Sequence, residues 1–204
     1  GSGAGKSVIL RSLIGLEKPD SGSIFIDGEE ITHLREHQLI EIRKKVAYVF
    51  QGGALFDSMS VYDNLAYPLR EHTKLSEFDI RGKIQSLLKE FGLNGTEAVY
   101  PAHLSGGMQK RVGLARAIIL NPQVILYDEP TAGLDPYNTK KIQEMILRNK
   151  AHGVTSIFVT HDMPSALEVC DRIALMVAGR IRVISELKSG LDPLIESFIK
   201  GEEP

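Results

Sequence analysis

The chain begins with a glycine-rich segment, Gly1-Ser2-Gly3-Ala4-Gly5-Lys6-Ser7, and apolar residues at helical spacing follow directly. Glycine permits backbone conformations in which successive N–H groups converge on an anion, and a helix N-terminus carries partial positive charge. Lys6 and Ser7 complete most of the pattern G-x-x-x-x-G-K-[ST], which cradles nucleotide phosphates. The phrase therefore predicts a phosphate loop in an α/β fold, and a flexible glycine-rich terminus is the alternative.

The roles of this loop follow from its chemistry. Lys6 is expected to supply positive charge to the β- and γ-phosphates, and the hydroxyl of Ser7 to reach Mg²⁺. The first glycine of the pattern would fall one place before Gly1. We therefore expect the N-terminus to be cut, with the first strands of the domain upstream of it.

A second motif is an apolar run, Val124–Tyr127, that ends in two adjacent acids, Asp128 and Glu129. A buried strand that finishes in two carboxylates is typical of a cation site. In a phosphate-loop protein the first acid would hold Mg²⁺ through water, and the second could take a proton from an attacking water. A solvated strand end is the alternative. Binding alone would not need Glu129, so its presence favours hydrolysis.

A third motif, Leu104-Ser105-Gly106-Gly107-Met108-Gln109, places a hydroxyl and two glycines at the start of a helix. Taken alone it is an ordinary N-cap, but it also resembles a second anion-binding nest. Since Gly3–Ser7 already provides one phosphate site, the second suggests the nucleotide of a partner copy. The motif therefore predicts a dimer.

The composition of the chain excludes several other classes of protein. The chain has 204 residues, 43% of them hydrophobic, and a formal net charge of −2, which suits one ordinary globular domain. That charge provides no global attraction to nucleic acid or an anionic membrane. The longest apolar run, Ile173–Ala178, is far shorter than the about 18 residues of a spanning helix. With the single cysteine Cys170 and no leader of signal-peptide type, a cytoplasmic location is expected.

Taken in order, these motifs resemble the ATP-binding cassette (ABC) family over nearly the whole chain. Gln51 resembles the Q-loop glutamine, and Leu104–Gln109 resembles the signature motif. Asp135 resembles the D-loop aspartate, and His161 the switch histidine. Members of that family pack two cassettes head to tail around two ATP molecules.

The resemblance implies a fold and a set of site residues. The fold is a P-loop NTPase with a RecA-like parallel-sheet core, a helical subdomain and a truncated antiparallel β-subdomain. It implies catalysis by Glu129, His161 and Gln51; ATP binding by Ser2, Gly3, Ala4, Gly5, Lys6, Ser7, Val8 and Asp128; and binding of the opposite subunit's ATP by Ser105, Gly106, Gly107, Met108 and Gln109. Mg²⁺ is assigned to Ser7, Gln51 and, through water, Asp128. Asp135 would cross the dimer interface.

Two departures from the family pattern have consequences. Met108 stands where many signature motifs have Gln, and Gln109 follows it, so the last side-chain contact of that motif stays open. The aromatic residue that stacks on adenine would lie upstream of Gly1.

The chain is expected to form one nucleotide-binding domain, residues 1–204. A helical subdomain is expected at about residues 57–120, with two helical stretches between about Ser60 and Gly92 followed by a helix that starts at Ser105. Ile173–Val177 and Arg180–Ile184 are expected to pair as a hairpin, and residues 186–204 form a C-terminal tail with a short helix.

Residues around Gln51–Met59, and the phrase from Asn64 to Thr73, resemble the ATPases of MCE-associated phospholipid transport, the Mla type of diderm bacteria. That resemblance implies a permease that docks near Gln51–Met59, an MCE lipid-binding subunit, no nucleic acid, and a peripheral position on the inner face of the cell membrane. An importer of small solutes or a cell-division ABC system is the alternative. A non-transport nucleotide switch would need tandem cassettes or a long coiled-coil insert.

Overall fold

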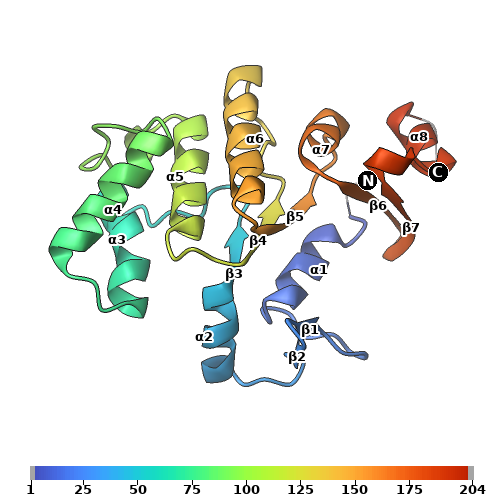
Figure 1. Ribbon diagram of the computed structural model, residues 1–204, viewed down its shortest axis with the longest axis horizontal. Helices are drawn as coiled ribbons and strands as arrows, with labels where there is room; N and C mark the ends of the chain where they lie inside the picture. Colours follow the sequence, from blue (N-terminus) through green and yellow to red (C-terminus); the bar gives the residue numbers. More distant parts are fainter. Residues whose placement is uncertain (1–2, 202–204) are drawn as a thin grey trace.

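The computed structural model describes residues 3–201 and is drawn in Figure 1. Its α-helices are α1 Lys6–Leu13, α2 Glu36–Lys45, α3 Val61–His72, α4 Glu77–Glu90, α5 Gly106–Ile118, α6 Pro136–Ala151, α7 Met163–Val169 and α8 Pro193–Ile199. Its strands are β1 Phe25–Ile26, β2 Glu29–Glu30, β3 Val46–Val49, β4 Val124–Asp128, β5 Thr155–Val159, β6 Arg172–Val177 and β7 Arg180–Glu186. Short 3-10 helices are η1 Pro101–His103 and η2 Leu187–Ser189.

Three parallel strands, in the order β3-β4-β5, form the central sheet. Helix α6 connects β4 to β5, because parallel neighbours need a crossover and a helix is the usual one. Asp128, at the end of β4, lies opposite Val159 at the end of β5. This arrangement confirms the expected α/β core and brings the carboxyl ends of both strands, where ligands bind in such sheets, to one edge.

The two faces of this sheet pack against different helices. Side chains alternate between faces along a strand, so Ile125 and Tyr127 join the buried cluster with α3–α6. Leu126 points the other way and packs with Leu10 of α1. By the same alternation Asp128 lies on the α1 face, toward the phosphate loop.

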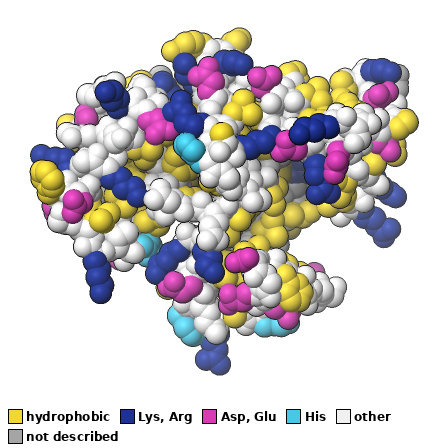
Figure 2. All heavy atoms as spheres, viewed as in Figure 1, with side chains coloured by type: hydrophobic (Ala, Val, Ile, Leu, Met, Phe, Trp, Pro, Cys, Tyr) yellow, Lys and Arg dark blue, Asp and Glu magenta, His cyan; other side chains and the backbone are white. Residues whose placement is uncertain are grey.

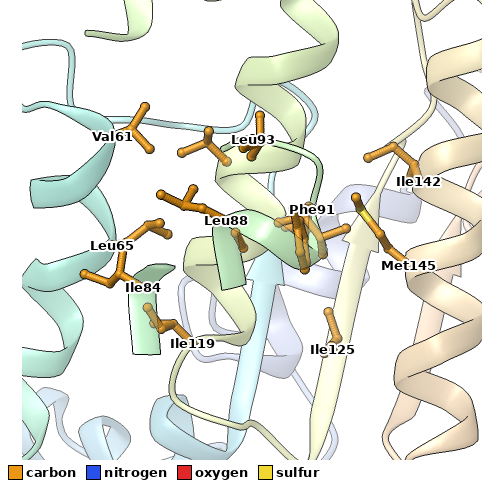
Figure 3. Close-up of a cluster of buried hydrophobic side chains, with 14 of the residues drawn as sticks. Val61, Leu65, Ile84, Leu88, Phe91, Leu93, Ile119, Ile125, Ile142 and Met145 are labelled. Atoms are coloured by element: carbon orange, nitrogen blue, oxygen red, sulfur yellow. The ribbon is translucent and has the colours of Figure 1, made fainter. Parts of the chain in front are cut away.

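The larger cluster ties the helices α3–α5 to the sheet, as Figure 3 shows. It includes Val61 and Leu65 of α3, Ile84 and Leu88 of α4, Ile119, Ile125 of β4, and Ile142 and Met145 of α6. Leu65, Ile84 and Leu88 are completely buried. Burial of one such side chain stabilises a fold by about 1.5–3 kcal/mol, so the cluster holds these helices firmly against β3 and β4.

Serine caps the start of each helix in this group. Ser60, Ser76 and Ser105 each accept a hydrogen bond from the backbone N–H three residues later, which satisfies one of the free N–H groups of the first turn. The predicted helices between Ser60 and Gly92, and the one that begins after Ser105, are confirmed.

Two antiparallel hairpins lie outside the central sheet. β1 and β2 turn at Asp27-Gly28, and β6 and β7 turn at Ala178-Gly179; both turns have positive φ at both residues. The β6–β7 hairpin and the short helix of the tail, α8, were both expected. In Figure 1 this hairpin lies at the right-hand side of the molecule, beside α7 and α8.

Figure 2 shows basic and acidic side chains interspersed over the viewed face rather than gathered by sign. Within residues 3–201, no helix is both long enough and apolar enough to span a membrane.

Candidate active site

The phosphate loop runs directly into α1. Gly3 has φ 80°, and Gly5, the N-cap of α1, has φ 93°, in a region that L side chains rarely adopt. Lys6 and Ser7 are then the first two residues of the helix, at its positive end. Ala4 lies in the loop between the two glycines, and Val8 is 46% exposed. Ser2 lies outside the described residues.

Asp128 connects three elements. Its Oδ1 accepts a hydrogen bond of 2.9 Å from the hydroxyl of Ser7 on α1, and its Oδ2 accepts one of 2.7 Å from the hydroxyl of Tyr48 on β3. Burial, and then the neighbouring Asp128 carboxylate, raise the pKa of Tyr48 well above its usual value. The aspartate is thus held from both sides, one oxygen at the phosphate loop and the other at the sheet.

Glu129 and His161 form a second pair, one strand further along the sheet edge. Glu129 Oε1 lies 2.9 Å from Nδ1 of His161, and Oε2 accepts a bond of 3.2 Å from the hydroxyl of Thr160. The glutamate side chain is 14% exposed and the histidine 68% exposed. Glu129 has φ 50°, an uncommon conformation for a non-glycine residue that costs free energy; Asp27, Ala54, Asn121 and Ala178 also have positive φ.

A lysine of α5 approaches the same glutamate. The Nζ of Lys110 donates a hydrogen bond to the backbone carbonyl of Ala132, just after β4. Burial lowers the pKa of Lys110, and the charge of Glu129 partly offsets that effect. The charges of Lys110 and Glu129 therefore interact, although the lysine bonds to the backbone after β4.

The signature residues lie at the N-terminus of α5. Ser105 uses its hydroxyl as the N-cap, accepting from the N–H of Met108 at 3.3 Å, and Gly106 begins the helix. A Cβ on Gly107 would come 2.5 Å from the side chain of Asn138, so a larger residue there would have to displace that side chain. Met108 packs against the larger core cluster.

Two of the expected site residues form hydrogen bonds within this chain: Gln109, expected at the opposite subunit's ATP, and Asp135, expected at the dimer interface. The side-chain amide of Gln109 donates to the carbonyl of Pro101 at 2.9 Å and fixes η1. Asp135 caps α6, accepting from the backbone N–H of Asn138 at 2.9 Å and from its amide at 2.6 Å. These bonds hold the pKa of Asp135 below its usual value.

The loop after β3 carries Gln51. Gln51 is exposed, and within residues 3–201 its side chain makes no hydrogen bond. Gly53, two residues later, packs closely against Gly113 of α5. A Cβ added to Gly113 would lie only 2.7 Å from the Cα of Gly53. Arg116 of α5 also donates to the carbonyl of Ala54 at 2.7 Å. The loop is thus fastened to the helix that bears the signature residues.

Asn64 of α3 holds the other end of that loop. It is fully buried, and its amide donates to the carbonyls of Phe56 and Met59 at 3.1 Å and of Ser60 at 3.0 Å. Its oxygen accepts from the N–H of Phe56 at 2.9 Å. The segment from Ala54 to Ser60 is therefore clamped between α3 and α5.

The structure brings the residues expected at the site into two contacting pairs, Ser7 with Asp128 and Glu129 with His161. Gln51 and Ser105 make no side-chain hydrogen bond with either pair among the described residues. The sequence interpretation missed Tyr48, Thr160 and Lys110. The alternation of side chains along β3 assigns Tyr48 to one face of the sheet. No local sequence pattern, however, indicates which strand lies next to β3.

The oxygen groups of Ser7 and Asp128 are ligand types that Mg²⁺ prefers. Among the described residues, no cluster of three or more His, Cys, Asp or Glu could hold a metal by itself. That arrangement fits a cation that is bound by one or two protein oxygens together with phosphates and water.

Comparison with known proteins places this geometry in a family. A family model described as ABC transporter matches residues 1–132. A probable ribonucleotide transport ATP-binding protein of Mycobacterium leprae is 44% identical over 98% of this chain and 59% of its own length. The MlaF ATP-binding proteins of the intermembrane phospholipid transport systems of Haemophilus influenzae and Escherichia coli are 42% and 39% identical, over 78% and 76% of their lengths.

A solved structure supports the same family as these sequence matches. An ATP-binding cassette determined as a dimer in a post-hydrolysis state, with ADP and Pi bound, superimposes with a TM-score of 0.84 and 33% identity, over 92% of this chain and 82% of that one. The chain spans only 59% of the length of the mycobacterial relative. The fold, the order of the motifs and these matches agree that the chain belongs to the ABC transporter family.

Proposed function

We propose that the chain is the ATP-hydrolysing subunit of an ABC transporter. The observation that carries the proposal is the pairing at the sheet edge, where Ser7 meets Asp128 and Glu129 meets His161, each at 2.9 Å. The first pair joins the phosphate loop to a carboxylate, and the second joins a candidate base to a histidine that orients it.

In this proposal different residues bind the phosphates, bind the metal and transfer the proton. The loop glycines and Lys6 bind the β- and γ-phosphates, and Ser7, Gln51 and, through water, Asp128 hold Mg²⁺. When bound, Mg²⁺ supplies positive charge against the phosphate oxygens. Glu129 takes a proton from the attacking water at a carboxylate oxygen. His161 fixes that carboxylate through Nδ1, which leaves Nε2 as the ring nitrogen for the γ-phosphate.

A second copy completes each site. Ser105, Gly106 and Gly107 would contact the γ-phosphate held by the other subunit, together with Met108 or Gln109, and Asp135 would lie at the subunit boundary. The solved relative that is a dimer with ADP and Pi supports this arrangement. ATP would close the dimer and hydrolysis would reopen it.

We assign residues 1–204 to one cassette, residues 57–120 to its helical subdomain and residues 186–204 to a tail.

The membrane partner is proposed to dock on the segment from Ala54 to Ser60, which is clamped between α3 and α5. The ring of Phe56 is exposed and lies 5.6 Å from that of Tyr67, so the loop and α3 offer an apolar surface near Gln51–Met59. A permease bound there would hold the chain at the inner face of the cell membrane.

The cargo is proposed to be phospholipid moved between envelope membranes, with an MCE subunit as lipid carrier. The similarity to the two MlaF proteins supports it. The mycobacterial relative named for ribonucleotide transport favours a second candidate, a small polar solute. Purification of the native complex separates them: an MCE-bearing complex with bound phospholipid supports the first, and a solute permease without lipid contradicts it.

The nucleotide part of the proposal is tested separately by Lys6→Ala. Without the lysine charge, ATP binding should weaken by at least about 10-fold, as measured by equilibrium titration with a fluorescent ATP analogue. Lys18→Ala, in the loop after α1, is the matched control. Unchanged ATP affinity in Lys6→Ala would contradict the assignment of the phosphate loop.

A further inference from the structure

The hydroxyl of Tyr48 makes a short hydrogen bond, 2.7 Å, to Oδ2 of Asp128. The other carboxylate oxygen is taken by Ser7 at 2.9 Å. The two donors come from different elements, α1 and β3, which pack in the same buried cluster. The carboxylate is therefore fixed about both of its oxygens, and rotation of its side chain would break at least one bond.

Strand geometry explains how a tyrosine reaches this position. Tyr48 pairs with Leu126 across the β3–β4 register, and Asp128 lies two residues beyond Leu126 on the same face. A diagonal neighbour of this kind is within reach of a long aromatic side chain. The ring of Tyr48 also packs on that of Phe50, with centroids 4.3 Å apart, directly before Gln51.

We propose that Tyr48 is a positioning residue for Asp128: its hydroxyl holds the carboxylate turned toward Ser7, in the orientation that serves the metal–nucleotide complex. The inference rests on the proposed function, since it takes Asp128 to act on Mg²⁺. A tyrosine that only filled space would act through its ring, whereas this role belongs to the hydroxyl alone.

Tyr48→Phe removes that hydroxyl and keeps the ring and its contact with Phe50. The affinity for a non-hydrolysable ATP analogue is measured with Mg²⁺ and again with EDTA, and the ratio of the two reports the metal-dependent part of binding. Because a hydrogen bond to a charged group is lost, we expect Tyr48→Phe to lower this ratio by about 3- to 10-fold, with the EDTA affinity unchanged.

Tyr127→Phe is the matched control. It deletes a tyrosine hydroxyl from the neighbouring strand, but on the opposite face, where that hydroxyl accepts a bond of 3.2 Å from Asn149. The control should leave the Mg²⁺/EDTA ratio as it is. Thermal unfolding of both variants checks that they are folded.

Asp128→Asn separates a failure of the inference from a failure of the proposed function. We expect it to lower the ratio, and we expect Tyr48→Phe to add nothing in the Asp128→Asn background, since the hydroxyl acts through that carboxylate. If Asp128→Asn lowers the ratio while Tyr48→Phe behaves like Tyr127→Phe, the positioning role is wrong and the proposed function stands.

Two other results would overturn the inference. An effect of Tyr48→Phe that is equally large in the Asp128→Asn background would mean that the tyrosine acts by another route. A ratio that Asp128→Asn leaves unchanged would remove the metal role of Asp128 and, with it, the role assigned to Tyr48.

Discussion

Glu129 Oε1 and His161 Nδ1 lie 2.9 Å apart, across the ends of two adjacent parallel strands. Thr160 donates to the other carboxylate oxygen at 3.2 Å, so both oxygens of the glutamate have a partner. The backbone of Glu129 also has positive φ, an uncommon conformation for a non-glycine residue. In the proposed function, this pair is the part of the site that distinguishes hydrolysis from binding.

His161→Ala should reduce ATP turnover by at least about 10-fold, because the carboxylate loses the group that orients it and general acid–base catalysis is worth about 10²–10⁴. ATP affinity should change by less than about 3-fold, since a single contact among many phosphate contacts is lost. Phosphate release and equilibrium titration measure the two quantities. His152→Ala, at the exposed end of α6, is the control. A variant with full turnover would show that the pair does not act in catalysis.

Asn64→Ala should destabilise the protein by about 2–4 kcal/mol, because it leaves several backbone groups of the loop after Gln51 without a partner in a buried site. Urea unfolding followed by circular dichroism measures the loss. Asn94→Ala, at an exposed position, should change stability by less than about 0.5 kcal/mol. Equal effects of the two substitutions would mean that the Asn64 clamp contributes nothing.

Two helical glycines should respond oppositely to alanine. A Cβ at Gly113 would lie 2.7 Å from the carbonyl oxygen and Cα of Gly53, whereas nothing lies within 4 Å of a Cβ at Gly82 of α4. Gly82→Ala should stabilise the protein by about 0.5–1 kcal/mol, the difference in helix propensity. Gly113→Ala should destabilise it by about 1–3 kcal/mol, since the loop must move away. Unfolding midpoints that shift in the same direction would contradict the close approach.

Cys170 should react slowly with thiol reagents. Burial raises the pKa of its thiol, so at neutral pH the thiolate fraction is smaller than that of an ordinary cysteine and grows only at higher pH. The chain has one cysteine, so the rate of reaction with a disulfide reagent reports this residue alone. We expect a rate at pH 7 at least about 10-fold below that of a cysteine peptide. A rate equal to that of the peptide would contradict the burial of this thiol.

Much of the fold and of the site could be predicted from local patterns. The serine cap of α5, the apolar run of β4 and the turn at Ala178-Gly179 are local signals, and each gave the right element. Asp128 and Glu129 were recognisable because two acids at the end of a buried run are rare. The order of the motifs along the chain then indicated the family.

What could not be predicted depends on neighbours that are distant in sequence. Helix α2 is largely polar and buries only Leu39 and Ile42, so its apolar pattern is too sparse to stand out. Asn64 is a polar residue of α3, and its amide is buried because it bonds to a loop whose position no local pattern indicates. The contact of Tyr48 with Asp128 depends on the order of the strands in the sheet, which no local sequence pattern indicates.

The most direct test of the account is the turnover of Glu129→Gln in the intact protein. The substitution keeps the size of the side chain and removes the base, so phosphate release should fall by at least about 100-fold, while ATP still binds and holds two copies together as a dimer in light scattering. Glu144→Gln, at a half-buried position of α6 that pairs with Lys141, is the control and should hydrolyse ATP normally. Normal phosphate release by Glu129→Gln would contradict the assignment of Glu129 as the catalytic base.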